Sequence, residues 1–383
     1  MSAGSHTSAI ATLVGDGTTG SPLGVAVIGT GTTGRLRAHL CRENPSVGYL
    51  ALCDLDEVKL DTVAKECRAD QAYTDAGAAI GDNRVDAVIV ATSEEAHFEP
   101  ALAAIQRGKP VLVEKPITVS PAEGETLVAA AEDLDVPLRV GFTQRFRRRY
   151  MTAKEHLVTG FLGELSTVNA KIYATRAVAD RVIERAPNSS PAVNTLTYCV
   201  DLLLWYFADR TPTRLYAQHT SSVLTSRHGV PDATWAIVTF DNGAVANLGV
   251  SWQPPRETPA YVASMELELF GSEGMLSITD NHRDALLVSS KPIPSPYSPD
   301  VTMHAALLGS AMPGDWALGR FYGPMRDETD LFLAGVRSGS MPAALPTGRH
   351  GLAVLNLTLA IDRSAESGTV LELDQYRLAA EPH

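Results

Sequence analysis

The 383-residue sequence has few cysteines, no long apolar runs and little positive charge. No apolar run approaches the roughly 18 residues that cross a bilayer. A net charge of -12 argues against a nucleic-acid or anionic-membrane surface, because both require concentrated positive charge. The four cysteines lack CxxC or metal-ligand spacing, so we expect no metal site and reduced core residues of a cytoplasmic protein: Cys41, Cys53, Cys67 and Cys199.

The first 34 residues contain neither Lys nor Arg, and their apolar run 10–14 is short, so a secretory signal is not expected. Residues 1–22 are rich in Ser, Thr, Gly and Ala without a hydrophobic pattern, which predicts a flexible arm. The remaining length predicts two domains. We place a nucleotide-binding domain at 23–143 and a substrate-binding and oligomerisation domain at 144–383.

Short, almost wholly apolar strands alternate with amphipathic helices in the first domain. This pattern predicts a mainly parallel sheet covered on both faces, as in an α/β Rossmann domain. The expected strands are 24–29, 49–54, 87–91, 111–114 and 138–142. The expected helices are 33–43, 57–66, 74–80, 100–106 and 121–134.

The second domain changes character, because successive strands are joined by short turns. Asp241-Asn242-Gly243 is a strong hairpin signal. We therefore expect an α+β domain with a large, mostly antiparallel sheet. Its expected strands are 164–174, 214–218, 234–240, 244–252, 266–270, 275–278 and 286–289. Its expected helices are 151–159, 191–207, 325–336 and 352–363, with a proline-rich loop at 291–299.

A glycine motif follows the first predicted strand at once, and an acidic residue follows the second. The motif reads Gly29-Thr30-Gly31-Thr32-Thr33-Gly34, and Asp54 comes twenty positions after its last glycine. This order predicts a dinucleotide site, with phosphates at the helix N-terminus and Asp54 on the ribose hydroxyls. Acidic neighbours, and the absence of Arg between Arg42 and Arg68, favour NAD over NADP.

Lys115 follows the strand 111–114, within the sequence Glu114-Lys115-Pro116. Ligands of open α/β sheets bind beyond the carboxyl ends of the strands, so this lysine is a candidate to meet the substrate. Taken alone, it is better explained as a structural or solvated lysine.

These motifs together resemble the glucose–fructose oxidoreductase/inositol dehydrogenase/rhizopine-catabolism (Gfo/Idh/MocA) family. The matching segments are 24–34, 86–116 and 160–165, with weaker similarity at 241–252 and 269–276. The resemblance implies that Lys115 lies beside the nicotinamide and substrate, and that the bond from this lysine to Pro116 is one that is often cis. It also implies cofactor contacts by Ala91, Thr92, His97 and Glu114, although His97 is equally explained as a helix-start histidine bonded to a backbone carbonyl.

The family usually carries D-x-G-x-H-x-x-D on its catalytic helix, and this chain departs from that motif. It has Asn194, Leu196 and Tyr198 before the retained Asp201. On an α-helix, positions 194, 198 and 201 share one face. This polar stripe lies on an otherwise apolar helix, which indicates either a wet pocket or a satisfied core network.

Tyr198 is a candidate acid/base in place of the family's histidine, and some sugar-oxidising branches of the family carry Tyr here. Lowering a phenol pKa from 10 to roughly 7 requires about 4 kcal/mol. One ammonium about 4 Å away supplies that amount at an effective dielectric near 20. We expect Lys115 to be that ammonium and to converge with Tyr198 on the reacting carbon, while Asn194 and Asp201 orient the hydroxyls.

The basic run 145–149 is interpreted as a solvated helix entry, with contact to a substrate phosphate as the alternative. Trp205, Tyr206 and Trp252 are interpreted as core residues rather than sugar-stacking platforms. The expected activity is an NAD-dependent dehydrogenase of a sugar, aminosugar or cyclitol, acting as a homodimer or homotetramer. The alternatives are an enzyme that retains and recycles NAD, or a non-catalytic NAD-binding sensor.

Overall fold

The computed structural model describes residues 21–187, 189–260, 262–281, 284–294 and 302–373. Almost all of the predicted arm, 1–22, therefore lies outside the described residues. Internal contacts divide the chain into two compact units. The first comprises Met1–Gly141 and Met325–Gly351, and the second comprises Phe142–Pro324 and Leu352–His383.

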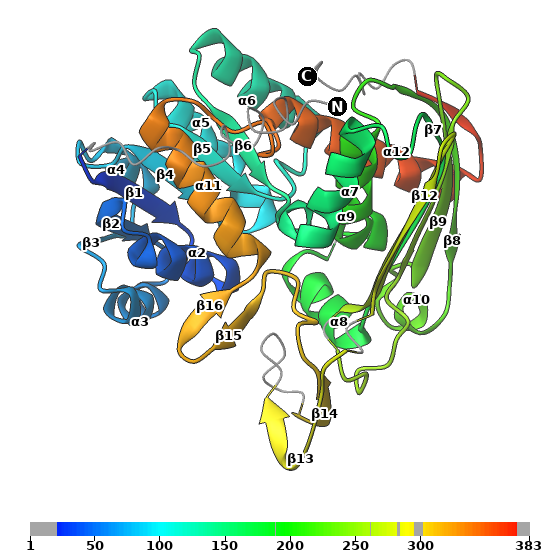
Figure 1. The fold of residues 1–383 in the computed structure, drawn as a ribbon. Coiled ribbons are helices and arrows are strands. Elements are labelled where there is room, and N and C mark those ends of the chain that lie inside the picture. Colours follow the sequence, from blue (N-terminus) through cyan, green and yellow to red (C-terminus); the bar gives the residue numbers. More distant parts are fainter. Residues whose placement is uncertain (1–20, 188, 261, 282–283, 295–301, 374–383) are drawn as a thin grey trace, which may run out of the picture. The chain divides into compact units, whose positions relative to one another are not determined.

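The first unit is built on a six-stranded parallel sheet of order β3-β2-β1-β4-β5-β6 (Figure 1). The central strands β1 and β4 are buried along their whole length, which explains their continuous apolar sequence. The prediction of a parallel Rossmann sheet is confirmed. The strands are β1 Leu23–Ile28, β2 Val47–Cys53, β3 Gln71–Tyr73, β4 Ala87–Val90, β5 Val111–Glu114 and β6 Leu138–Gly141.

Helices connect these strands, and two of them begin at an aspartate cap. Asp56 accepts a hydrogen bond from the Lys59 N–H at the start of α3, and Asp75 does the same for the Ala78 N–H at α4. The helices are α2 Thr32–Glu43, α3 Glu57–Cys67, α4 Ala76–Gly81, α5 Phe98–Gln106, α6 Pro121–Asp133 and α11 Pro324–Ser338.

Helix α11 was assigned to the second domain from the sequence, because a linear division at 143 placed it there. The structure instead packs Met325–Gly351 with the first unit. Polar contacts explain this packing, because Glu328 and Thr329 of α11 bind the fully buried Arg37 of α2. This assignment of residues 325–351 was wrong.

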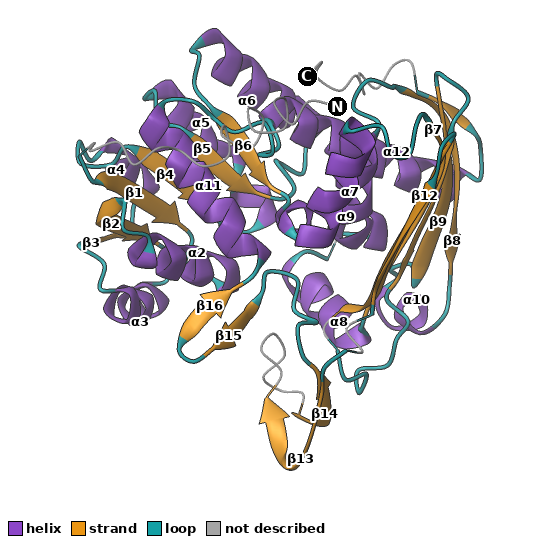
Figure 2. Ribbon diagram, viewed as in Figure 1, coloured by secondary structure: helices purple, strands orange, loops and turns teal. Residues whose placement is uncertain are grey.

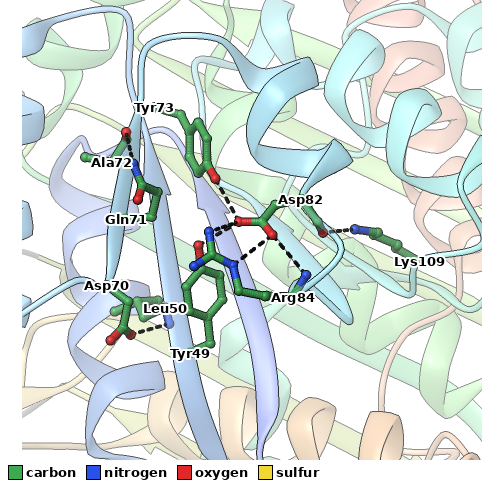
Figure 3. Close-up of polar contacts among 9 residues, drawn as sticks. All are labelled: Tyr49, Leu50, Asp70, Gln71, Ala72, Tyr73, Asp82, Arg84 and Lys109. Carbon is green, nitrogen blue, oxygen red and sulfur yellow. Dashed lines mark hydrogen bonds and ion pairs between the residues drawn. The ribbon is translucent and has the colours of Figure 1, made fainter.

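The short edge strand β3 was missed, because its residues are largely exposed and form no apolar run. Figure 3 shows what holds this edge of the sheet: Asp82 accepts hydrogen bonds from the hydroxyls of Tyr49 and Tyr73, both at 2.7 Å. Arg84 adds a 2.8 Å ion pair to the same carboxylate, and Lys109 donates to the Asp82 carbonyl. These contacts, chiefly with Arg84, hold the pKa of Asp82 well below its usual range.

The second unit contains a seven-stranded sheet of order β12-β11-β7-β10-β9-β8-β17. All its neighbouring pairs are antiparallel except β7 with β10, so the mostly antiparallel prediction is confirmed. The predicted hairpin joins β9 to β10, with Gly243 at φ 82°. The strands are β7 Leu165–Ala174, β8 Pro212–Thr220, β9 Ala233–Phe240, β10 Val245–Ser251, β11 Val262–Gly271, β12 Met275–Asp280 and β17 Leu371–Glu372.

The helices of this unit (Figure 2) depart from the prediction at three places. Helices α8 and α10 were not predicted, and the single helix expected at 191–207 is a π-helical turn, Ala192–Leu196, followed by α9. The helices are α7 Arg148–Val158, α8 Arg176–Arg185, α9 Thr197–Tyr206, α10 Val223–His228 and α12 Gly348–Ser367, which begins in the first unit.

Two hairpins complete the second unit. Strand β13, Leu286–Pro294, pairs with β14, Thr302–Leu307, and β15, Asp315–Ala317, pairs with β16, Arg320–Tyr322. The proline-rich loop expected at 291–299 is therefore wrong over its first four residues, and the rest lies outside the described residues. None of the described helices combines the length and hydropathy needed to cross a bilayer.

The predicted core residues are confirmed. Trp252 is completely buried among apolar side chains of β7 and α8, and its indole N–H donates to the Thr195 hydroxyl at 2.8 Å. Trp205 and Tyr206 are buried as well. All four cysteines are buried and none forms a disulfide.

Candidate active site

The turn after β1 requires glycine at two positions and is left open at a third. Gly29 has φ +92°, and a Cβ there would lie 2.5 Å from the Ala91 carbonyl oxygen. A Cβ on Gly34 would lie 1.8 Å from the Gly29 carbonyl oxygen, so the helix and strand meet at this point. A Cβ on Gly31 would meet nothing within 4 Å. Space beside Gly31 therefore remains for a ligand to approach the backbone.

The N-terminus of α2 is arranged to receive an anion. Its N-cap is Gly31, which has no side chain to cap the first N–H groups, and its first turn contains no acidic residue. Thr32 is exposed and Thr33 is half-buried, so this end of the helix is accessible. Uncapped N–H groups and the positive end of the helix dipole together favour a phosphate.

Asp54 follows β2 and braces the glycine turn. Its Oδ2 accepts hydrogen bonds from the Thr30 N–H at 2.7 Å and the Thr30 hydroxyl at 2.8 Å, and its Oδ1 accepts from the Asp56 N–H. Partial burial raises the pKa of Asp54, but these hydrogen bonds outweigh that effect and leave the pKa below its usual value. The carboxylate oxygens retain lone pairs for ribose hydroxyls. The acidic turn also holds one cation, Lys59, 3.6 Å from Asp56.

Ala91 and Thr92 follow β4 at the same edge of the sheet. The Ala91 N–H donates to the Ile28 carbonyl at 2.7 Å, which joins the end of β4 to the end of β1. Thr92 donates its hydroxyl hydrogen bond to the Ala96 carbonyl at 3.0 Å. Both residues therefore lie beside the glycine turn, as a cofactor site at this edge requires.

His97 lies at the start of α5 and is almost completely buried. Its Nδ1 lies 2.8 Å from the carbonyl oxygen of Pro116. Burial lowers the pKa of His97, so the ring is neutral and Nδ1 carries the donated proton. The structure thus contains the backbone hydrogen bond of the simpler interpretation, while contact of His97 with the cofactor stays a prediction.

Glu114 and Lys115 close β5 at the carboxyl edge of the sheet. The Lys115–Pro116 bond is cis, as the family resemblance implied, and Lys115 is half-buried. The Glu114 carboxylate accepts a 2.7 Å hydrogen bond from Arg37 Nε. The sequence analysis missed this partner, because 77 positions separate the two residues. Direct contact of Glu114 with the cofactor stays a prediction.

In the second unit, Asp201 is an ion-pair residue in a dry environment. Arg145 Nη2 lies 2.5 Å from Asp201 Oδ1, and Arg145 Nε lies 3.3 Å from Oδ2. Both side chains are at most 3% exposed, and the Arg145 guanidinium lies 4.6 Å from the centre of the Trp205 ring. The interpretation of Arg145 as solvated was wrong, because this carboxylate holds it in the core.

The rest of the basic run divides in two. Arg147 is mostly buried and pairs with Asp280 at 3.2 Å, so it too is not a freely solvated residue. Arg148 and Arg149 are exposed, as the helix-entry interpretation expected, although Arg149 also pairs with Asp280 at 3.1 Å. Arg145 and Arg147 of the run therefore form ion pairs inside the second unit.

The polar stripe is only partly what the sequence predicted. Asn194 is buried in the π-helical turn, so the regular α-helical spacing from Asn194 to Tyr198 does not hold there. Tyr198 is half-buried in the first turn of α9. The Asp201 end of the stripe is a core network, and π-helical turns inside α-helices are frequent at functional sites. No sequence signal indicated the π-helical turn.

Among the described residues, no group of three or more His, Cys, Asp or Glu side chains could hold a metal ion. The first unit instead offers one edge of a parallel sheet that brings together a glycine turn, an uncapped helix N-terminus and an ionised carboxylate. These features define a dinucleotide-binding protein of the doubly wound α/β class.

Comparison with known proteins identifies the family. Residues 23–142 match the Gfo/Idh/MocA family described as "Oxidoreductase family, NAD-binding Rossmann fold", and residues 150–277 match the Gfo/Idh/MocA C-terminal domain. The chain therefore belongs to the Gfo/Idh/MocA oxidoreductases, and its first unit is an NAD-binding Rossmann domain.

Individual relatives match over nearly their whole length. The chain is 25% identical to myo-inositol 2-dehydrogenase of Thermotoga maritima, covering 92% of this chain and 98% of that protein. It is also 25% identical to D-apiose dehydrogenase of Paraburkholderia graminis, covering 93% and 91% respectively. The crystal structure of scyllo-inositol dehydrogenase from Lactobacillus casei with bound NAD(H) and scyllo-inositol has a TM-score of 0.74 at 15% identity, covering 92% and 99%.

Proposed function

We propose that this oxidoreductase is an NAD-dependent dehydrogenase that acts on a secondary alcohol of a sugar, aminosugar or cyclitol. The observation that carries the proposal is the position of Lys115, at the carboxyl edge of the sheet that also carries the glycine turn. The relatives named as inositol and apiose dehydrogenases support this substrate class.

The residues of the first unit divide the work of holding NAD. Gly31, Thr32 and Thr33 would receive the pyrophosphate at the N-terminus of α2, and Asp54 would accept the ribose hydroxyls. NAD bound by these residues would supply the acceptor for the hydride of the carbinol carbon. An ionised Asp54 would repel the 2′-phosphate of NADP, which supports the preference for NAD.

The proposed proton transfers use side chains of the protein. We assign Lys115 or Tyr198 to take the hydroxyl proton in the oxidative direction and to return it to the ketone oxygen in the reductive direction. Asn194 is the proposed partner that orients the substrate hydroxyls. Asp201 shares this proposed role, although its ion pair with Arg145 makes it the weaker candidate of the two.

Substitution of Lys115 tests the central assignment. Lys115→Ala should lower turnover at least about a hundredfold, the scale typical of a proton-transfer residue. The matched control is Lys109→Ala, because Lys109 precedes the same strand at its opposite end and donates to the Asp82 carbonyl. The control should keep turnover within about threefold, and near-native turnover of Lys115→Ala would remove Lys115 from the proposal.

Tyr198→Phe decides whether the phenol takes part. If Tyr198 is the acid/base, the variant loses one limb of the pH–rate profile. Tyr216→Phe is the control, because Tyr216 is an exposed tyrosine on β8 of the same unit. An unchanged profile for Tyr198→Phe would leave Lys115 as the acid/base.

We further propose that the chain forms a homo-oligomer through the outer face of the seven-stranded sheet. Tyr216 and Ile237 are exposed partners across β8 and β9, and the exposed Trp235 packs over Gly249 beside them. Adjacent exposed apolar side chains of this size are typical of association surfaces. Sedimentation of Trp235→Lys/Ile237→Lys should give a smaller species than the wild type.

A cytoplasmic location also stays a proposal, supported by the four free cysteines.

A further inference from the structure

The turn that carries Lys115 is anchored on both sides by buried side chains. The residue before Lys115, Glu114, binds Arg37 through its carboxylate. The residue after it, Pro116, accepts a hydrogen bond from His97 through its carbonyl oxygen. Neither anchor follows from the dinucleotide motif, and α2 and the start of α5 supply them independently.

The Arg37 anchor is dry and held from three directions. The side chain has no exposed surface, and its Nη2 lies 2.5 Å from Glu328 Oε2 while its Nη1 donates to the Thr329 hydroxyl at 2.7 Å. A Cβ on Gly141 would lie 3.1 Å from both Arg37 Nη2 and the Glu114 carboxylate. The guanidinium therefore has little room to move, and it holds the Glu114 carboxylate in place.

The His97 anchor has a single hydrogen-bond function. Its Nδ1 bonds to the Pro116 carbonyl, whereas its buried Nε2 has no hydrogen-bond partner within the described structure. A buried polar nitrogen without a partner costs free energy. The 2.8 Å hydrogen bond of Nδ1 goes to the backbone directly after Lys115, so this bond ties the buried imidazole to the turn.

We propose that Arg37 and His97 are positioning residues that fix where the Lys115 ammonium lies. This inference rests on the proposed function, in which Lys115 touches the substrate. It differs from the expectation that His97 and Glu114 contact the cofactor themselves. Arg37 acts through the Glu114 side chain and His97 through the Pro116 carbonyl, so the loss of either residue lowers turnover without weakening NAD binding.

His97 variants separate positioning from cofactor contact. His97→Leu removes the N–H that bonds Pro116, whereas His97→Asn places a side-chain N–H near the position of Nδ1. We expect His97→Leu to lower turnover at saturating NAD and substrate by about tenfold or more. His97→Asn should restore turnover to within about threefold of wild type, and both variants should bind NAD within about twofold of it by calorimetry.

Glu114 variants test the other anchor without emptying the buried Arg37 site. Glu114→Gln keeps an acceptor for Arg37 and should retain turnover within about threefold, whereas Glu114→Ala should lose about tenfold. Asp82→Asn is the matched control, because Asp82 is a multiply bonded carboxylate at the other end of the sheet (Figure 3). It should lower the thermal stability and leave turnover unchanged.

A double-mutant cycle with Lys115→Ala shows whether these residues act through the lysine. In that background, His97→Leu should leave the residual turnover unchanged within about twofold. Multiplying losses would overturn the inference, as would a tenfold weaker affinity of His97→Leu for NAD or equal damage by His97→Asn and His97→Leu. Near-native turnover of Lys115→Ala would instead refute the proposed function, so the two failures are distinguishable.

Discussion

The buried carboxyl group of Asp362 makes the stability of the second unit depend on pH. Asp362 lies on α12, and its Oδ2 accepts a hydrogen bond from the Ser190 hydroxyl, while its buried Oδ1 has no hydrogen-bond partner among the residues that the structure describes. The other titratable groups nearby are His219, whose Nε2 lies 3.9 Å from Oδ1, and Glu366. Burial raises the pKa of Asp362 from 3.8 to about 7, and the Ser190 hydrogen bond only partly opposes it.

The sign and size of the effect follow from this raised pKa. The folded chain holds the Asp362 proton more tightly than the unfolded chain, so its contribution is fully favourable below about pH 4 and is lost as the pH rises to about 7. At 1.36 kcal/mol per pH unit, ionising this group costs the folded state about 4 kcal/mol above pH 7. Asp362→Asn stays neutral, so it should be more stable than wild type by up to that amount at pH 8.

Thermal unfolding followed by circular dichroism at pH 5 to 8 measures this difference. The gap between Asp362→Asn and wild type in free energy of unfolding should widen from pH 5 to about pH 7 and then level off. Burial lowers the pKa of His219, which acts in the opposite sense below pH 6.5, so the size of the gap is read at pH 7 to 8, where His219 is neutral in both proteins. Ser190→Ala removes the hydrogen bond that opposes the raised pKa of Asp362, so its loss of stability relative to wild type should grow as the pH rises. A gap that does not change between pH 5 and 8 would refute the reasoning.

Three further predictions concern the NAD site and the core. Gly31→Ala should leave the melting temperature unchanged but weaken NAD binding at least about tenfold in calorimetry. Gly34→Ala should lower the melting temperature, because its Cβ would lie 1.8 Å from a backbone oxygen. Equal melting temperatures of the two variants would contradict this prediction. Asp54→Ala should raise the KM for NAD and reduce the ratio of kcat/KM with NAD to kcat/KM with NADP. An unchanged ratio would show that Asp54 is not the source of the preference for NAD. Asp201→Asn should cost about 3–5 kcal/mol in denaturant unfolding, because Arg145 stays buried without its counter-charge; a loss below about 1 kcal/mol would argue against this.

The NAD-binding half could be predicted almost completely, because its signals are local. The buried strands β1 and β4 are continuous apolar runs, and the turn after β1 requires glycine at positions 29 and 34. Asp54 was found by spacing alone, and the structure adds that it braces Thr30 inside the same motif. Short-range physics of this kind is readable in a single sequence.

The missed features divide into two kinds. Helix α8 carried a signal, since Val178, Val182 and Ile183 lie on one helical face and are buried. Arg37 gave none: its partner Glu328 lies 291 positions away, and nothing in a run of charges tells a buried arginine from a solvated one. The same holds for Arg145, whose partner lies 56 positions away.

The return of residues 325–351 to the first unit has a consequence for how this protein is made. During synthesis, β1 to β6 leave the ribosome long before α11 does, so Arg37 has Glu114 but neither Glu328 nor Thr329. The buried side chains of Phe332 and Leu333 are missing from the nascent unit as well. The NAD-binding half is therefore completed only once residues 325–351 have been made, and a gene fragment truncated at residue 143 would encode a permanently unfinished domain.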